Sequence, residues 1–206
     1  IYMINQFGQL DSITGIGDVV QSVKVKDDKL FVIVNNSHKI IVYNISSDGI
    51  ALPGIHVSTN DSSPREMVVV KDKLYFTNWN TMDIKYLDLI NYKVNQLVKT
   101  DGLPEDIIHK DNRLYFTINM NEDYTSSDKV LSYDLDKNEI DKTYNVGKGP
   151  LNLAFKNKDL FVSNTYYDEN YNSYHGTTKI LDNESVIIKD YGKDAPCGGS
   201  IHNIEN

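Results

Sequence analysis

Apolar residues along this chain fall in short runs separated by polar turns, and no stretch holds the period of an amphipathic helix through several turns. The runs are rich in Val, Ile, Tyr, Phe and Thr, the residue types that favour strands. The five prolines fall between the runs rather than inside them. The pattern therefore predicts an all-β protein.

One of these runs recurs along the chain. Residues 73–78 read Lys-Leu-Tyr-Phe-Thr-Asn, and variants of this run occupy residues 29–35, 113–119 and 159–164. Each copy stops at an Asn, continues through a polar loop and adds a second short run. These second runs end at Asn44, Asp88, Asp134 and Asp182, which are 44, 46 and 48 residues apart. Repeats of about 40 to 50 residues with several short strands each predict the blades of a β-propeller.

The repeat predicts one propeller domain over residues 1–206, with complete four-stranded blades at about 17–62, 63–102, 103–149 and 150–198. Residues 1–16 form a partial blade, and residues 199–206 the opening strand of the next. Propellers usually close by completing one blade from both termini, which leaves no exposed sheet edge. The chain is then either a small ring with an imperfect seam or, as we favour, a segment of a larger ring that further blades or a partner chain complete.

Two residue types hold fixed places in the repeat. Three prolines directly precede the first strand of a blade, where a fixed φ and a missing amide donor are tolerated: Pro64, Pro104 and Pro150. Four asparagines stand where the recurring run ends: Asn35, Asn78, Asn119 and Asn164. An Asn at a strand exit bonds the local backbone and tolerates left-handed geometry, so we interpret these four as structural.

The composition of the chain narrows the range of partners and locations that it can have. With 206 residues and 40% apolar content the chain can bury a core. Its net charge of −8 argues against nucleic acid or an anionic membrane surface as the main partner. Cys197 is the only cysteine, which excludes an internal disulfide. No apolar run approaches the roughly 20 residues of a membrane span, and no leader is visible, so we expect no direct membrane insertion.

The repeats resemble a known family. Gly-Asp-Val-Val-Gln-Ser at 17–22, Tyr-Phe-Thr-Asn-Trp at 75–79 and Leu-Pro-Glu at 103–105 are similar to the YVTN/YncE-like β-propellers, with Phe76 in place of the Val of the signature. The similarity covers nearly the whole chain and is strongest to the secreted and surface-anchored branch of unknown function in Bacteroidetes. It implies seven blades, an extracytoplasmic location and binding rather than catalysis. Some similar surface propellers capture corrinoids through loops on one face of the disc.

In a four-stranded blade, the link between the second and third strands and the link to the next blade lie on the same face of the disc. We therefore expect a small polar ligand or a protein to bind at this face, which two long loops, 119–128 and 164–175, enlarge. The inner links also bring Glu66 and Asp106 here. The predicted ligand-binding residues are Gln21, Asn36, Arg65, Trp79, Asn80, Glu105, Asn121, Asn152, Tyr166 and Tyr167.

Three of these features have two interpretations each. Trp79 is either an aromatic platform for a planar ligand or a packing residue between blades. Arg65 either binds a carboxylate or phosphate group of a ligand through two N–H groups, or forms an ion pair with Glu66 or Glu105. The tyrosines of the last loop resemble a paratope in composition, or form a solvated hairpin tip: Tyr166, Tyr167, Tyr171 and Tyr174.

Catalytic and metal motifs are weak. The acids of 119–128 lack the spacing of an EF-hand loop, and the five histidines fall in different repeats without zinc-ligand spacing. No Gly-x-Ser-x-Gly elbow is present. We expect no cofactor and no catalysis. A structural module of a larger assembly is the main alternative, and a propeller enzyme of lactonase or quinoprotein type is the more distant one.

Overall fold

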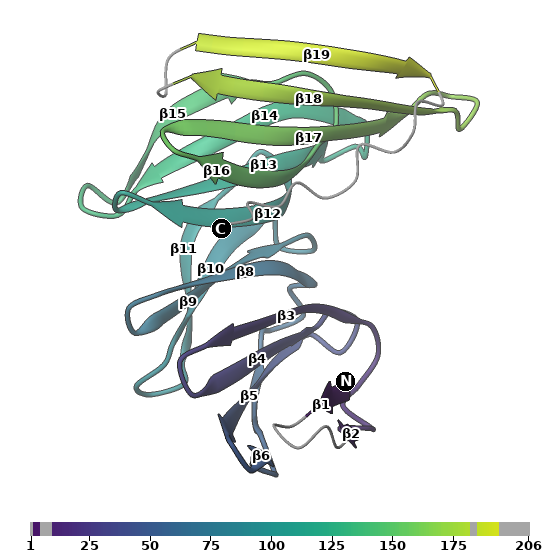
Figure 1. Ribbon diagram of the computed structural model, residues 1–206. Coiled ribbons are helices and arrows are strands. Elements are labelled where there is room, and N and C mark those ends of the chain that lie inside the picture. Colours follow the sequence, from purple (N-terminus) through teal and green to yellow (C-terminus); the bar gives the residue numbers. More distant parts are fainter. Residues whose placement is uncertain (1, 5–9, 182–184, 194–206) are drawn as a thin grey trace.

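The computed structural model describes residues 2–4, 10–181 and 185–193. Every regular element in these residues is a β-strand, and none of them belongs to a helix long and apolar enough to cross a membrane. Figure 1 shows four sheets that follow one another in chain order, with the N-terminal hairpin beside the first of them. That hairpin pairs β1 (Tyr2–Ile4) with β2 (Leu10–Ser12).

Each of the four sheets is one antiparallel blade. Blade 1 runs β3 (Val20–Lys26), β4 (Lys29–Val34), β5 (Lys39–Ser46) and β7 (Ile55–Ser58), and β6 (Gly49–Ile50) pairs with the end of β5. Blade 2 runs β8 (Pro64–Val70), β9 (Lys73–Asn78), β10 (Asp83–Asp88) and β11 (Val94–Lys99). Blade 3 runs β12 (Gly102–Lys110), β13 (Arg113–Asn121), β14 (Ser126–Asp134) and β15 (Glu139–Asn145). Blade 4 runs β16 (Pro150–Lys156), β17 (Asp159–Tyr167), β18 (Ser173–Leu181) and β19 (Ser185–Lys193).

The predicted all-β fold with four blades of four strands is thus confirmed. The short strand β6 is an addition that the pattern did not predict, and residues 199–206, predicted to open a further blade, lie outside the described residues. Pro64 and Pro150 each begin the first strand of their blade, whereas Pro104 is the third residue of β12.

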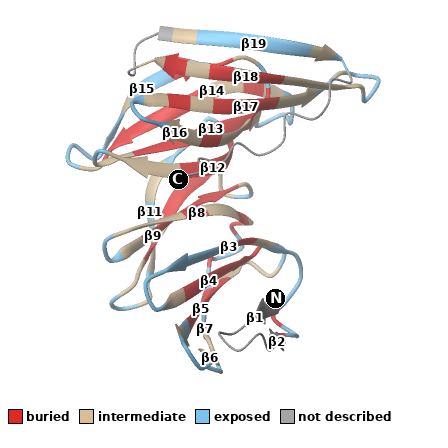
Figure 2. Cartoon of the chain, in the orientation of Figure 1, coloured by how far each residue is buried: buried red, intermediate tan, exposed pale blue. Residues whose placement is uncertain are grey.

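The core lies between the blades. Phe31 and Ile33 of blade 1 pack against Met67 and Phe76 of blade 2 in one buried cluster, and similar clusters join blades 2 and 3 and blades 3 and 4. Figure 2 shows this burial along the middle strands, with exposed residues gathered at turns and outer strands. Because side chains alternate along a strand, each blade gives one apolar face to either neighbour.

A β-bulge interrupts the first strand of every blade at the same place. The register shifts lie between Val20 and Ser22 in blade 1 and between each blade's proline and the third residue after it in blades 2 to 4. A bulge leaves an unpaired residue and re-aims the side chains beside it. Here the re-aimed residues are polar in most blades: Gln21 and Ser22, Arg65 and Glu66, Glu105 and Asp106, Leu151 and Asn152.

A hydroxyl on the second strand satisfies the amide that the bulge leaves unpaired. The Glu66 N–H donates to Thr77 Oγ1 (3.0 Å), the Asp106 N–H to Thr117 Oγ1 (2.9 Å), and the Asn152 N–H to the Ser163 hydroxyl (3.1 Å). Thr77 and Thr117 in turn donate to backbone carbonyls of the next blade. Thr77 and Thr117 are therefore joints between blades.

The four recurring asparagines occupy two different places, which corrects the prediction of one shared role. Asn78 and Asn164 pair with Pro64 and Pro150, but Asn35 and Asn119 lie one residue beyond the equivalent position. A one-residue shift turns a side chain to the other face of a strand. Asn35 and Asn119 consequently donate to the Pro64 and Pro150 carbonyls of the next blade (2.8 and 3.1 Å).

The other two asparagines bond near their own strand. The Asn78 amide donates to the carbonyls of Phe76 and Asp83 (both 3.3 Å), which is the local bonding that the sequence predicted. The Asn164 amide donates to carbonyls of the link before its blade, at Val146, Gly147 and Lys148. None of the four asparagines has the left-handed φ that was expected.

We expect Asn119→Ala to lower the free energy of unfolding by about 1 to 2 kcal/mol, because the buried Pro150 carbonyl would lose its donor. Asn121→Ala is the matched control: its side chain bonds only Thr125 and Ser126 of the same hairpin, and its loss should stay within about 0.5 kcal/mol. Urea denaturation of both variants measures the difference. Equal losses would contradict the role of Asn119 between blades.

Candidate functional site

We call the side of the array that carries the blade-to-blade links and the second-to-third strand links the loop face. Nine of the ten predicted ligand-binding residues fall into three sets, and the tenth, Tyr167, is exposed. Gln21, Arg65, Trp79 and Glu105 are joined by direct contacts. Tyr166 lines a cavity in blade 4. The others, apart from Tyr167, bond their own neighbourhood.

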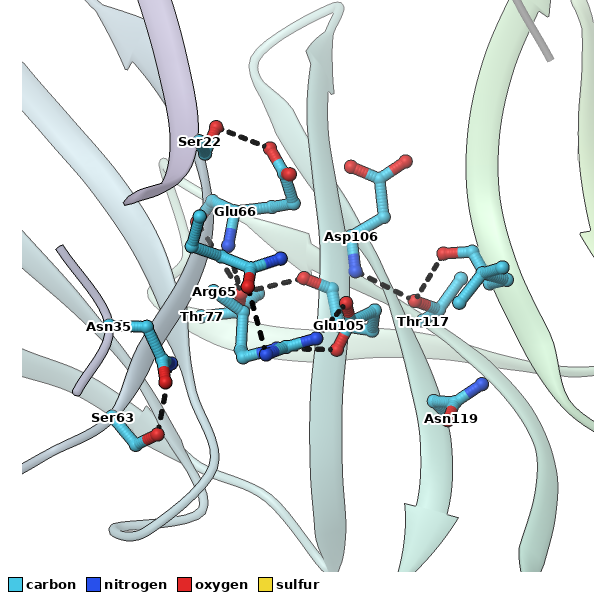
Figure 3. A network of polar contacts seen from close by, with 12 residues as sticks. Ser22, Asn35, Ser63, Arg65, Glu66, Thr77, Glu105, Asp106, Thr117 and Asn119 are labelled. Carbon is cyan, nitrogen blue, oxygen red and sulfur yellow. Dashed lines mark hydrogen bonds and ion pairs between the residues drawn. The ribbon is translucent and has the colours of Figure 1, made fainter. Parts of the chain in front are cut away.

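The first set is centred on the Arg65 guanidinium. Its Nε and Nη2 atoms each donate to one carboxylate oxygen of Glu105 (both 2.9 Å), and Nη1 donates to the Gln21 side-chain oxygen (3.1 Å). The guanidinium carbon lies 4.2 Å from the centre of the Trp79 ring. These contacts join blades 1, 2 and 3. Figure 3 shows the bonds between Arg65 and Glu105.

This geometry answers the question left open for Arg65. The residue pairs with Glu105, not with Glu66, and each of its three nitrogens already donates a hydrogen bond. The planar guanidinium can form a bidentate contact with one carboxylate at a time, and Glu105 already makes that contact. The same contact gives one face of Trp79 to Arg65, while the indole Nε1 is buried without a partner among the described residues. The primary role of these four residues, Gln21, Arg65, Trp79 and Glu105, is therefore to hold three blades together. We call them the clamp.

Glu66 and Asp106, which follow Arg65 and Glu105 in their bulges, form a second polar layer beside the clamp (Figure 3). Ser22 donates its hydroxyl proton to Glu66 (2.7 Å), and burial raises the pKa of Glu66. Asp106 accepts the N–H groups of Ile107 (2.8 Å) and of Leu153 in the next blade (2.7 Å). Burial, with a smaller contribution from the Glu66 charge, raises the pKa of Asp106 to about 6.

The sequence placed these two acids on the same face but did not predict them as site residues. Their equal position in two repeats, directly after Arg65 and Glu105, was the available signal. The bulge that brings them together is a register effect, which a hydrophobic pattern does not reveal.

Most other predicted residues are engaged locally. The Asn36 amide donates to Asp18 (3.2 Å), that of Asn80 to the Asp61 carbonyl (3.1 Å) and that of Asn121 to Thr125 (3.0 Å). Asn152 uses its backbone amide in the bulge. The structure thus places these four in turns and bulges rather than with Arg65.

The tyrosines of the last loop divide into a stacked pair and an exposed pair. Tyr166 and Tyr174 lie on paired strands, with ring centres 4.9 Å apart and planes 8° from parallel. The turn beyond them is held by Asp168, whose carboxylate accepts the Asn172 side-chain amide (2.8 Å). Tyr167 and Tyr171 are 61% and 88% exposed. The loop is thus a hydrogen-bonded hairpin with an aromatic wall at its base and exposed tyrosines at its tip.

A cavity of about 170 Å³ opens beside this wall. It lies between the link that precedes β16, the ends of β17 and β18, and the bulged part of β19. Its lining residues are Gly147, Lys148, Asn164, Tyr166, His175, Gly176, Ile188, Lys189 and Asp190. Only Tyr166 among these was predicted as a ligand-binding residue.

No group of three His, Cys, Asp or Glu residues stands close enough to hold a metal ion in the part of the chain that the structure describes. In the acidic loop 119–128, the Asp123 carboxylate accepts the hydroxyl and backbone amide of Thr125 (2.6 and 3.0 Å). These bonds stabilise charged Asp123 and lower its pKa. Asp123 therefore stabilises the turn of its own loop.

Comparison with known proteins supports the fold. No family model matches the chain, and no curated protein matches its sequence. A protein of unknown function from Bacteroides caccae superposes with a TM-score of 0.67 at 16% identity, over 92% of this chain and 74% of the other. Hydrazine synthase of Kuenenia stuttgartiensis gives 0.67 at 14% identity, over 87% of this chain and 53% of the other.

A Bacteroides uniformis protein provisionally named as a 6-phosphogluconolactonase superposes with a TM-score of 0.63 at 13% identity, over 91% of this chain and 61% of the other. The array is therefore β-propeller-like, with a Bacteroides protein among its structural neighbours. Identities this low show the fold alone, since one fold hosts many activities.

Proposed function

We propose that this chain is a non-catalytic binding domain of an extracytoplasmic, YncE-like propeller of the YVTN type, and that it takes a small polar ligand at its loop face. The observation that carries this proposal is the cavity beside Tyr166. It combines an aromatic wall, charged side chains and a rigid scaffold, which is the usual composition of a ligand site. Nothing in it selects a corrinoid.

The buried acids and the arginine of the loop face are the residues that could most readily take part in catalysis. Their contacts favour a binding role over a catalytic one. Asp106 is buried and its two oxygens accept the N–H groups of Ile107 and Leu153, so it serves as a joint to blade 4. Arg65 and Glu105 form an ion pair with each other. The loop face thus offers a binding surface on a network that holds the blades.

A specific observation favours an interaction role as the second candidate. Val23 of β3 is 44% exposed, whereas the equivalent Met67 and Ile107 are buried against the preceding blade, and Val25, two residues further along β3, is 63% exposed. The face of blade 1 that carries these valines therefore suits another blade of the same repeat, from further blades or from a partner chain, beside the Ile13 and Ile16 side chains already packed there.

The ligand site can be tested with ligand-observed NMR, using glucose, adenosine, phenylalanine and benzoate as probes on the intact chain. We expect at least one probe to bind, and Tyr166→Leu to weaken it about tenfold or more, because the variant loses the aromatic wall. Tyr171→Leu, at the exposed tip of the same hairpin, is the matched control and should bind like the unaltered protein.

Thermal melting of both variants checks that the hairpin stays folded. Equal binding by the Tyr166 and Tyr171 variants, or no binding of any probe, would refute a ligand site at this cavity.

A further inference from the structure

We propose that a cavity between blades 2 and 3 on the turn face binds a neutral sugar of the size of one hexose, with the Tyr75 hydroxyl among the groups that recognise it. The turn face is the side opposite the loop face. It carries the turns that join the first strand of each blade to the second, and the third to the fourth. This cavity is separate from the one beside Tyr166, so the inference goes beyond the proposed function.

The cavity lies where turns of the two neighbouring blades meet. Blade 2 supplies Lys71 and Asp72 of the β8–β9 turn, and blade 3 supplies Asn112 of the β12–β13 turn and parts of the β14–β15 turn. Its volume is about 280 Å³. A cavity of about 150 Å³ takes up benzene in a well-studied protein. A single hexose, which is somewhat larger than benzene, therefore has room here.

The repeat explains why the space is left between blades 2 and 3. Between blades 3 and 4, the Phe155 ring meets the Tyr115 ring edge-on, with ring centres 5.1 Å apart. By strand register, Tyr75 of blade 2 is the equivalent of Tyr115, and His109 of blade 3 is the equivalent of Phe155. The Tyr75 ring contacts Tyr86 of its own blade, at 5.8 Å between centres. A smaller ring at 109 leaves more space beside Tyr75.

Tyr75 brings a buried hydroxyl to this space. It lines the cavity although only 4% of it is exposed, and its hydroxyl has no hydrogen-bond partner among the described residues. The pairing of β8 with β9 puts Val70, Lys73 and Tyr75 on the face of blade 2 that packs against blade 3. Burial raises the pKa of the Tyr75 phenol, so the hydroxyl stays protonated. It can both donate and accept, as a sugar hydroxyl does.

The charged groups of the lining balance one another. Two lysines and two acids line the cavity: Lys71, Lys73, Asp72 and Asp136. Lys73 Nζ lies 4.5 Å from the centre of the Tyr86 ring. A ligand of either charge would meet two like charges as well as two opposite ones, so the cavity gains little from a charged ligand. This balance favours a neutral one.

Two amides complete the polar lining. Asn112 and Asn138 stand in turns with φ of +59° and +57°, and neither side-chain amide has a hydrogen-bond partner in the part of the chain that the structure describes. An amide donates and accepts, a carboxylate accepts and an ammonium donates. The hydroxyls of a sugar can satisfy all three kinds of group, whereas an apolar ligand of the same size would leave them unpaired.

The test is a titration of the isotope-labelled, intact chain followed by amide NMR spectra. Glucose, galactose and mannose are the neutral probes, and glucosamine and glucuronate share the ring of glucose but carry a charge. We expect at least one neutral hexose to bind, to shift the amide signals of 70–75 and 135–138, and to bind at least as tightly as the charged probes. Tyr75→Phe removes only the hydroxyl and should weaken this binding about three- to tenfold, the loss of one neutral hydrogen bond.

Tyr115→Phe is the matched control. Tyr115 holds the equivalent position in the next blade and packs against Phe155 rather than lining this cavity, so the variant should bind the hexose like the unaltered protein. Thermal melting of both variants checks the fold. Tyr75→Phe should melt like the unaltered protein, because its hydroxyl makes no hydrogen bond within the described residues.

The outcomes also separate this inference from the proposed function. The inference is overturned if no neutral hexose binds, if Tyr75→Phe and Tyr115→Phe bind equally well, or if a charged probe binds more than tenfold tighter than glucose. Shifts confined to the residues around Tyr166 would overturn it and support the proposed function. Shifts at 70–75 that Tyr75→Phe weakens, with no probe sensitive to Tyr166→Leu, would support it while the proposed function fails.

Discussion

Arg65→Met is expected to lower the free energy of unfolding by about 3 kcal/mol, because it leaves the Glu105 carboxylate buried without its partner. The Arg65 and Glu105 side chains are only 19% and 9% exposed, so water restores little of the lost interaction. The variant also removes the contact with Trp79 and the bond to Gln21, which ties blade 1 to the clamp. Urea denaturation followed by fluorescence of the single tryptophan measures the loss.

Two further variants make this prediction specific. Arg65→Met with Glu105→Met removes both charges and should recover most of the stability, since apolar replacement of a buried pair is often nearly neutral. Arg113→Met is the matched control, because Arg113 is the other arginine and is more exposed, at 35%, where it pairs with Asp134 and Asp141. We expect it to cost about 1 kcal/mol. A loss at Arg65 no greater than at Arg113 would contradict the clamp.

The repeated sequence was sufficient to predict the blades because strand length, turn spacing and apolar alternation are local properties. Leu74, Tyr75 and Phe76 carry that signal in one copy, and their equivalents carry it in the others. The bulges were not predictable in this way, since the pattern of apolar residues stays intact when one extra residue enters a strand. Thr77 and Thr117 marked the places of two bulges, but their role is visible only in the structure, where the backbone N–H groups of Glu66 and Asp106 donate to them.

The candidate site was only partly predictable for a related reason. Residues in the inner bulges are brought together by the repeat itself, so Gln21, Arg65 and Glu105 could be grouped from sequence. The cavity beside Tyr166 could not be predicted, because it depends on the register of β18 against β19 and on the link before β16. Tyr166 was found because an aromatic residue in a long loop is informative by itself.

The contribution of Asp106 to the stability of this protein is expected to fall by about 3 kcal/mol as the pH rises from about 4 to about 6. Burial raises the pKa of this carboxyl from its ordinary value of 3.8 to about 6 in the folded chain. The folded state therefore holds the proton over a range in which the unfolded state has released it. Each pKa unit corresponds to about 1.4 kcal/mol, so the stabilising effect of the bound proton is complete below about 4 and lost above about 6.

The measurement compares the free energy of unfolding of the unaltered protein with that of Asp106→Asn from pH 4 to pH 7. Other groups titrate in both proteins and cancel in this comparison. The difference in the free energy of unfolding should therefore decline between pH 4 and about 6 and level off above that. Glu66→Gln should move the decline to lower pH, because the Glu66 charge contributes to the raised pKa, and should leave most of the decline, because burial is the larger cause. A difference that stays flat or grows with pH would show that Asp106 is charged in the folded state throughout, and that its bonds to Ile107 and Leu153 outweigh its burial.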